Sequence, residues 1–161
     1  MIYNYIMVCP AYTDPREKVF VDMDGVLADF YTMMQRVKAI LGEGADHNEI
    51  KRTQGWYLSL PPISGAVEAF HELDKHFNVY ILSTPSWTNV YSWTEKRLWV
   101  MEHLGQPAYK KLILSHNKGL FSGRALIDDK KDTNQPQFDG EHIHFGHEPF
   151  EDWNKVLNYL L

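Results

Sequence analysis

Cysteine is nearly absent from this chain of 161 residues, in which Cys9 is the single example. One cysteine cannot form a disulfide within the chain, so the core must hold the fold, and a reducing compartment such as the cytoplasm is expected. A catalytic thiol is disfavoured, because no neighbouring residue in the sequence would activate Cys9.

Long hydrophobic runs are missing too. The apolar stretch in residues 1–9 is too short to cross a bilayer and lacks a basic flank, so neither a signal peptide nor a membrane partner is predicted. Positive charge is also scarce: 16 Lys and Arg stand against 21 Asp and Glu, which gives a net charge of −5. Because nucleic acid polymers are bound through a basic face, they are not expected partners.

The chain does have a regular alternation of short apolar runs and segments with helical spacing. Expected strands start at Val19 and cover 78–83, 112–115, 125–127 and 142–145, and expected helices cover 27–41, 63–76, 87–104 and 149–161. This alternation predicts an α/β fold, a Rossmann-like three-layer α/β/α arrangement with a mostly parallel sheet.

One domain is expected over residues 18–161, preceded by a tail or extra strand at 1–17. Residues 27–63 do not fit the simple alternation and directly follow the first strand. We therefore expect 27–63 to form a small helical cap over the carboxyl end of the sheet, where it would exclude water and contact a ligand.

Paired acids follow two of the predicted strands. Asp22 and Asp24 end the first strand, and Asp128 and Asp129 end the strand at 125–127. Ligand sites of parallel sheets lie at the carboxyl ends of the strands, so the four carboxylates should converge there. Their mutual repulsion calls for a hard cation, and Mg2+ is the expected cofactor.

With a phosphate bound beside such an ion, Asp22 can attack phosphorus and form an aspartyl-phosphate, while Asp24 acts as acid and then as base. Ser83 and Thr84, at the end of the strand 78–83, and Lys118, after the strand 112–115, can bind phosphate oxygens. Each feature alone has a plainer interpretation: exposed acids, a helix cap at Ser86, or a surface lysine.

Together these residues resemble the haloacid-dehalogenase-like phosphohydrolases, and most closely the 5'(3')-deoxyribonucleotidase family. The resemblance runs from about Lys18 to Trp153. The matching stretches are Asp22-Met23-Asp24-Gly25-Val26-Leu27-Ala28-Asp29-Phe30, Gly65-Ala66-Val67-Glu68-Ala69, Ser83-Thr84-Pro85, Trp99-Val100, Ser115-His116-Asn117-Lys118 and Leu126-Ile127-Asp128-Asp129.

The resemblance implies a phosphatase that acts on nucleoside monophosphates. It makes Asp22 the nucleophile and Asp24 the acid/base. It implies that Mg2+ is held by Asp22, the carbonyl of Asp24 and one aspartate of the second pair, for which we favour Asp129 with Asp128 behind it. Cap aromatics would hold the base; the candidates are Phe30, Trp56 and Tyr57.

Relatives carry an arginine and an acid before the motif lysine, where this chain has His116 and Asn117. If that pair contacts the base or the phosphate, substrate preference differs here, so His116 is a further candidate for substrate binding. The extension through Glu17 is also outside the shared pattern.

Three alternatives stay open. A sugar phosphate or another small phosphomonoester could be the substrate, or the fold could serve as a non-catalytic binding module. A second metal site is conceivable at His142, His144 and His147, although no carboxylate pattern supports it. The sequence also leaves a homodimer open.

Overall fold

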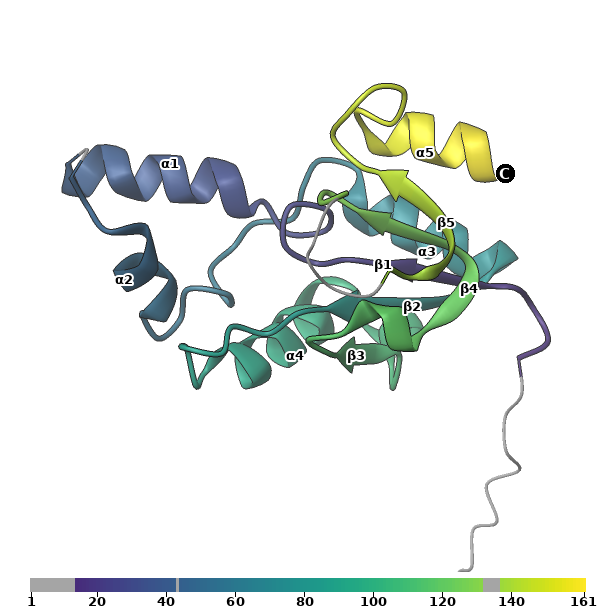
Figure 1. Cartoon of the computed structure of the whole chain (residues 1–161), viewed down its shortest axis with the longest axis horizontal. Coiled ribbons are helices and arrows are strands. Elements are labelled where there is room, and N and C mark those ends of the chain that lie inside the picture. Colours follow the sequence, from purple (N-terminus) through teal and green to yellow (C-terminus); the bar gives the residue numbers. More distant parts are fainter. Residues whose placement is uncertain (1–13, 43, 132–136) are drawn as a thin grey trace, which may run out of the picture.

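A computed structural model describes residues 14–42, 44–131 and 137–161, so most of the predicted tail at 1–17 lies outside the described residues. Five parallel strands form one sheet in the order β3-β2-β1-β4-β5 (Figure 1). They are β1 (Lys18–Val21), β2 (Asn78–Ser83), β3 (Leu112–Leu114), β4 (Ser122–Asp128) and β5 (Asp139–His144). The predicted Rossmann-like α/β class is confirmed.

Helices connect the strands. They are α1 (Phe30–Leu41), α2 (His47–Arg52), α3 (Ala66–His76), α4 (Ser92–His103) and α5 (Trp153–Leu160), with short 3-10 turns η1 (Gln106–Ala108) and η2 (Lys118–Leu120). Aspartate side chains cap three of them by accepting backbone N–H groups: Asp29 for α1, Asp46 for α2 and Asp152 for α5. None of the helices in the described ranges is long and apolar enough to cross a membrane.

Side chains alternate along the central strands and divide the core into two clusters. Val19 and Val21 point into the larger cluster, together with residues of α3, α4 and α5. Phe20 points the other way, into a smaller cluster with Leu82 and Leu126 that Phe121 and Phe138 help to cover. The ends of β1 and β4 are therefore fixed by packing on both faces.

The segment that carries α1 and α2 extends away from the sheet and returns beside its own start (Figure 1). Its two connections run together, because Asp29 N donates to Pro61 O at 2.8 Å and Ile63 N donates to Leu27 O at 2.8 Å. The segment thus leaves and re-enters the fold at one place, next to the end of β1.

Helix α4 starts at Ser92, later than the predicted Trp87, because Asn89 holds the preceding segment in another conformation. Buried Asn89 accepts the N–H of Tyr91 and donates to the carbonyls of Lys51 and Thr53. Ser86 is not the helix cap, since its carbonyl instead accepts the hydroxyl of Ser92. The segment before α4 is thereby bound to the end of α2.

Candidate active site

The two acidic pairs meet at the carboxyl ends of β1 and β4. The backbone N–H of Asp22 donates to Ile127 O at 2.8 Å, which ties the first pair to the strand that carries the second. Ligand atoms of Asp22, Asp128 and Asp129 lie within 4.8 Å of one another, and no other such group of three occurs in the described ranges. The acids predicted from the sequence are brought together.

A tight turn after β1 directs Asp24 away from this trio. Strand β1 ends at Val21, so the turn, and not the alternation of an extended strand, places Asp24. Gly25 has a φ of +82°, and a Cβ there would lie 2.7 Å from the ring of Tyr31 and 2.8 Å from a carboxylate oxygen of Asp129. The turn therefore requires glycine at this position.

Lys118 lies between the two strand ends. Its Nζ is 2.6 Å from Asp128 Oδ2 and 3.1 Å from Asp22 Oδ2. Burial acts to raise the pKa of Asp22, but the charges of Lys118 and Lys96 outweigh it and hold that pKa below its usual value. In the same way, Asp22 and Asp128 overcome burial and raise the pKa of Lys118.

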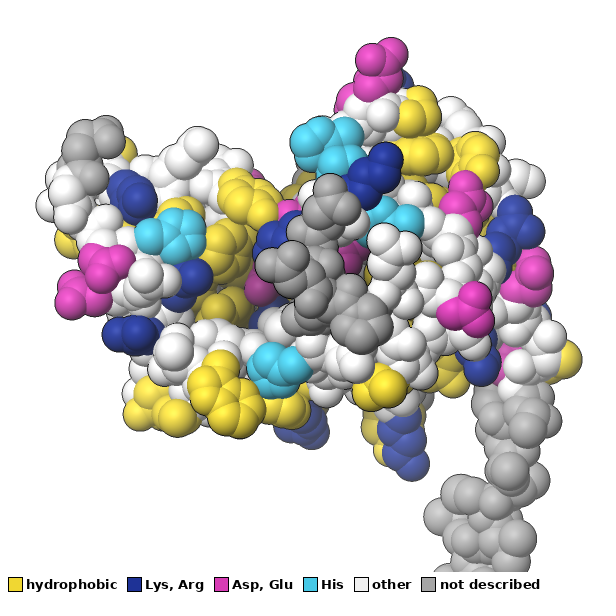
Figure 2. All heavy atoms as spheres, viewed as in Figure 1, with side chains coloured by type: hydrophobic (Ala, Val, Ile, Leu, Met, Phe, Trp, Pro, Cys, Tyr) yellow, Lys and Arg dark blue, Asp and Glu magenta, His cyan; other side chains and the backbone are white. Residues whose placement is uncertain are grey.

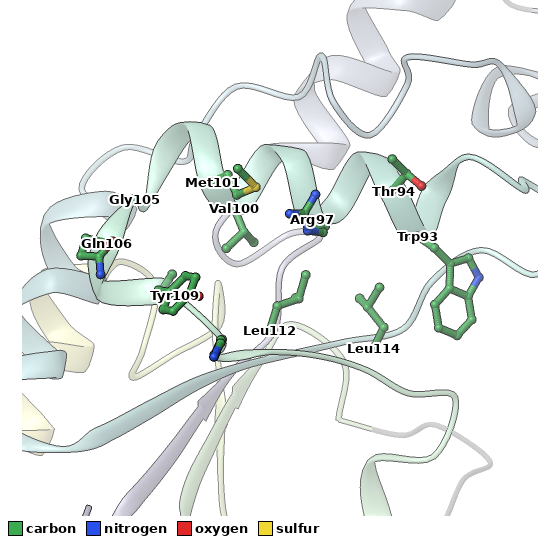
Figure 3. A pocket seen from close by; sticks show the side chains of 12 residues that line it. Trp93, Thr94, Arg97, Val100, Met101, Gly105, Gln106, Tyr109, Leu112 and Leu114 are labelled. Carbon is green, nitrogen blue, oxygen red and sulfur yellow. The ribbon is translucent and has the colours of Figure 1, made fainter. Parts of the chain in front are cut away.

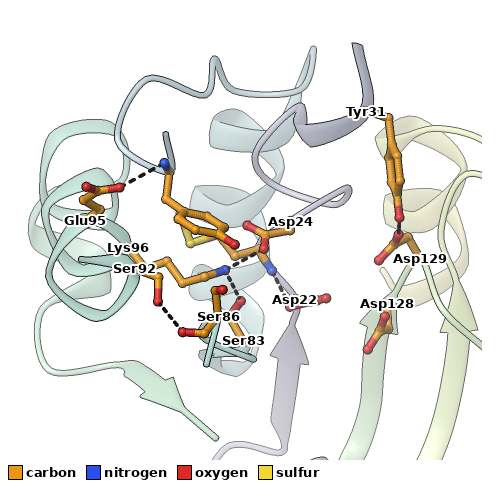
Figure 4. Close-up of polar contacts among 12 residues, drawn as sticks. Asp22, Asp24, Tyr31, Ser83, Ser86, Ser92, Glu95, Lys96, Asp128 and Asp129 are labelled. Atoms are coloured by element: carbon orange, nitrogen blue, oxygen red, sulfur yellow. Dashed lines mark hydrogen bonds and ion pairs between the residues drawn. The ribbon is translucent and has the colours of Figure 1, made fainter. Parts of the chain in front are cut away.

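A second lysine, which the sequence analysis missed, contacts Asp24 and Ser83. Lys96 of α4 is completely buried, and its Nζ lies 2.8 Å from Asp24 Oδ2 and 2.9 Å from Ser83 Oγ (Figure 4). Sequence reasoning had one usable signal: Lys96 is four residues before buried Val100, on the same face of α4.

Asp129 has a tyrosine partner. The hydroxyl of half-exposed Tyr31 donates to Asp129 Oδ2 at 2.6 Å (Figure 4). Burial, and then this hydrogen bond, raise the pKa of Tyr31 well above its usual value. The pKa of Asp129 is also raised, by burial and by the charge of Asp22, which the Tyr31 hydrogen bond opposes.

The phosphate-binding candidates of β2 lie at the same edge. Ser83 is buried at the end of the strand, and its carbonyl accepts Ser115 N at 3.0 Å, which joins the ends of β2 and β3. Thr84 follows it and is partly exposed.

The three aromatic candidates for base binding pack against one another. The ring of Phe30 lies 5.6 Å from that of Trp56 and 6.5 Å from that of Tyr57, and all three side chains are buried in the core. Glu95 of α4 anchors this part, because its carboxylate accepts Gly55 N at 2.6 Å and Tyr57 N at 3.0 Å. Sequence reasoning also missed Glu95.

His116 lies apart from those three rings. Its ring is 5.5 Å from that of Trp87 and 6.0 Å from that of Trp93, and its Nε2 is buried without a hydrogen-bond partner. Trp87 itself is 83% exposed. His116 therefore belongs to an aromatic group beside α4 and not to the group around Phe30.

The three histidines of the alternative metal site do not converge on one point. The rings of His144 and His147 stack at 3.8 Å, that of His142 lies 6.2 Å from His144, and His144 Nε2 is 3.0 Å from Asp129 O. Stacked rings direct their nitrogen lone pairs side by side, which does not suit a shared ion.

A groove of about 950 Å³ lies between α4 and β3 (Figure 3). Its lining includes Trp93, Val100, Met101, Tyr109 and Leu112 and contains none of the acids described above. Figure 2 shows acidic and basic side chains in the hollow between the α1–α2 segment and the rest of the fold.

The donor set suits a hard divalent ion. Both oxygens of Asp128 have partners, Lys118 Nζ at 2.6 Å and Lys130 N at 2.9 Å, whereas Asp129 Oδ1 is buried without one. A cation beside Asp22 and Asp129 would supply the missing partner and offset the repulsion between the carboxylates.

Comparison with known proteins identifies the family of the chain. Residues 47–156 match the family described as 5' nucleotidase, deoxy (pyrimidine), cytosolic type C. A protein of Vibrio phage KVP40, named as a candidate 5'(3')-deoxyribonucleotidase, is 45% identical over 88% of this chain and 83% of its own length. The human cytosolic 5'(3')-deoxyribonucleotidase is 31% identical over 70% of both chains, and the mouse mitochondrial one is 29% identical over 87% of this chain and 71% of its own.

The match to the family covers well over half of the residues, and the phage relative aligns with nearly the whole domain. The chain therefore belongs to the 5'(3')-deoxyribonucleotidase family of haloacid-dehalogenase-like proteins, as its motifs predicted.

Proposed function

We propose that this protein is a Mg2+-dependent phosphatase that hydrolyses nucleoside monophosphates through an aspartyl-phosphate on Asp22. The observation that carries the proposal is the convergence of Asp22, Asp128 and Asp129, the first two of them paired with Lys118, in a chain of this family. Names of the relatives support a nucleotide substrate.

Asp22, Asp129 and the carbonyl of Asp24 would hold the ion, and Asp128 would support it from behind. This division is supported by Asp128, whose two oxygens are already bound by Lys118 and Lys130. When bound, Mg2+ supplies positive charge that screens the carboxylates from each other and from the incoming phosphate.

Asp22 would attack phosphorus while the bond between phosphorus and the sugar oxygen breaks. Asp24 would give that sugar oxygen a proton. In the second half, Asp24 would take a proton from water as the water attacks phosphorus and the bond to Asp22 breaks. The lowered pKa of Asp22 supports this role, because a nucleophile must be anionic. Lys118, Ser83 and Thr84 would hold the phosphate oxygens.

The segment 27–63 would act as the cap. The aromatic rings it carries, Phe30, Trp56 and Tyr57, would flank the base, with His116 approaching from the β3 side. Because these three rings are packed together in the core, a base would contact their edges or require the cap to open.

The test is phosphate release from a panel of deoxy- and ribonucleoside monophosphates and sugar phosphates, with Mg2+ and with a chelator. We expect turnover of nucleotides that chelation abolishes, and Asp22→Asn should lower kcat by more than about 10⁴-fold, as loss of a nucleophile does elsewhere. Equal turnover of sugar phosphates would favour the alternative substrate. Activity of Asp22→Asn that matches wild type would refute the mechanism.

A further inference from the structure

We infer that Lys96 is a positioning residue that sets Asp24 and Ser83 for the reaction; this inference rests on the proposed function. Its ammonium group reaches both residues from α4, on the opposite side of the site from Lys118. The site would thus use two lysines with different tasks, of which Lys96 is the fully buried one.

The burial of Lys96 indicates a specific task. Its side chain is 0% exposed, and a buried ammonium group is costly unless it is paired and hydrogen-bonded. Asp24 and Ser83 supply that compensation, and the Tyr57 ring lies 5.0 Å from Nζ. Neighbouring Glu95 ties the same turn of α4 to the backbone of Gly55 and Tyr57, so Lys96 is held in a fixed place.

Lys96 fixes the orientation of the Asp24 carboxylate. Its Nζ takes Oδ2, while Oδ1 is buried and has no hydrogen-bond partner. The ion pair with Lys96 therefore holds the Asp24 carboxylate in one orientation. Without Lys96 the carboxylate could rotate, and proton transfer would lose its alignment.

Lys96 also orients the Ser83 hydroxyl. An ammonium group can only donate, so Ser83 Oγ accepts from Nζ and must direct its own hydrogen elsewhere. At the end of β2 that hydrogen is free to reach a phosphate oxygen. One lysine would thereby prepare the proton donor and one phosphate contact together.

The test compares a nucleoside monophosphate, whose alkoxide leaving group needs a proton, with p-nitrophenyl phosphate, whose phenolate leaves without one. In Lys96→Met we expect kcat for the nucleotide to fall by about 10²-fold or more, the range of general acid catalysis. For p-nitrophenyl phosphate we expect a fall of no more than about tenfold, with KM raised for both substrates through Ser83.

Controls separate a positioning role from a structural one. Lys75→Met, an exposed lysine paired with Glu72 on α3, should leave both rates unchanged. In an Asp24→Asn background, Lys96→Met should cost little more on the nucleotide, because the two act together. Lys96→Gln is the second variant if Lys96→Met unfolds.

Equal losses on both substrates, or additive losses with Asp24→Asn, would overturn the role of Lys96 while leaving the phosphatase proposal intact. By contrast, wild-type protein that releases phosphate from neither substrate would refute the proposed function itself.

Discussion

Two walls of the site are built in opposite ways. The strand wall, made of Asp22, Asp128 and Asp129 at the ends of β1 and β4, places charges where a parallel sheet normally places its ligand groups. The helix wall, made of Glu95 and Lys96, buries a neighbouring pair of opposite charges in the middle of α4. Charged residues there are usually exposed.

The two walls differ in what offsets the free-energy cost of their charged side chains. In the strand wall, Asp22 and Asp128 share Lys118, and in our proposal the carboxylates also share a metal ion. The helix wall uses the protein alone: Glu95 accepts the backbone N–H groups of Gly55 and Tyr57, and Lys96 binds Asp24 and Ser83. We therefore expect a change at Glu95 of the helix wall to affect folding, and a change in the strand wall to affect the metal.

Glu95→Gln should give the largest effect on folding. It removes the charge from two hydrogen bonds, to Gly55 N and Tyr57 N, and hydrogen bonds to charged groups contribute about 1.5–3 kcal/mol each. We expect the free energy of unfolding in urea to fall by about 2 kcal/mol.

Glu102→Gln is the matched control, because Glu102 is exposed on the same helix and should change stability by less than about 0.5 kcal/mol. If Glu95→Gln were as stable as wild type, Glu95 would not anchor the segment that contains Gly55 and Tyr57.

Tyr31→Phe should have a smaller effect, on the strand wall. The Tyr31 hydroxyl binds Asp129 Oδ2 at 2.6 Å, and groups that orient a metal ligand typically change metal affinity by about 10- to 100-fold. Since Tyr31 is half-exposed, we expect the Mg2+ concentration for half-maximal activity to rise roughly tenfold.

Tyr159→Phe is the control for that change. It removes a similar hydrogen bond, from Tyr159 to Glu141, outside the site. If Tyr31→Phe needed no more Mg2+ than wild type, Asp129 would not be a ligand of the metal ion.

The strand wall could be predicted from the sequence because its signals are local. Runs such as Ala125-Leu126-Ile127 identify the strands, and acids directly after them must lie at the sheet edge. The order of the motifs along the chain also indicated the 5'(3')-deoxyribonucleotidase family, and the comparisons with known proteins confirmed that family.

The helix wall could not be predicted in the same way. The burial of Glu95 and Lys96 depends on partners 38 to 72 residues away in the sequence, Tyr57 and Asp24, which only the fold brings near. Likewise, the late start of α4 depends on Asn89 reaching the end of α2. Tertiary contacts override local helical spacing here.

Tyr57 lies near both Lys96 and Asp24, and its ionisation gives the prediction with the smallest expected effect. Burial, and then the charge of Asp24, raise the pKa of Tyr57 to about 12 from a usual 10.0. The unfolded chain therefore loses this proton first, so the folded state binds more protons between pH 10 and 12, and stability must fall as pH rises through that window.

Tyr57→Phe lacks the proton, so its free energy of unfolding in urea should run parallel to wild type below pH 9 and fall less steeply above pH 10. Parallel curves over the whole range would mean that neither burial nor the charge of Asp24 raises the pKa of Tyr57 in the folded protein.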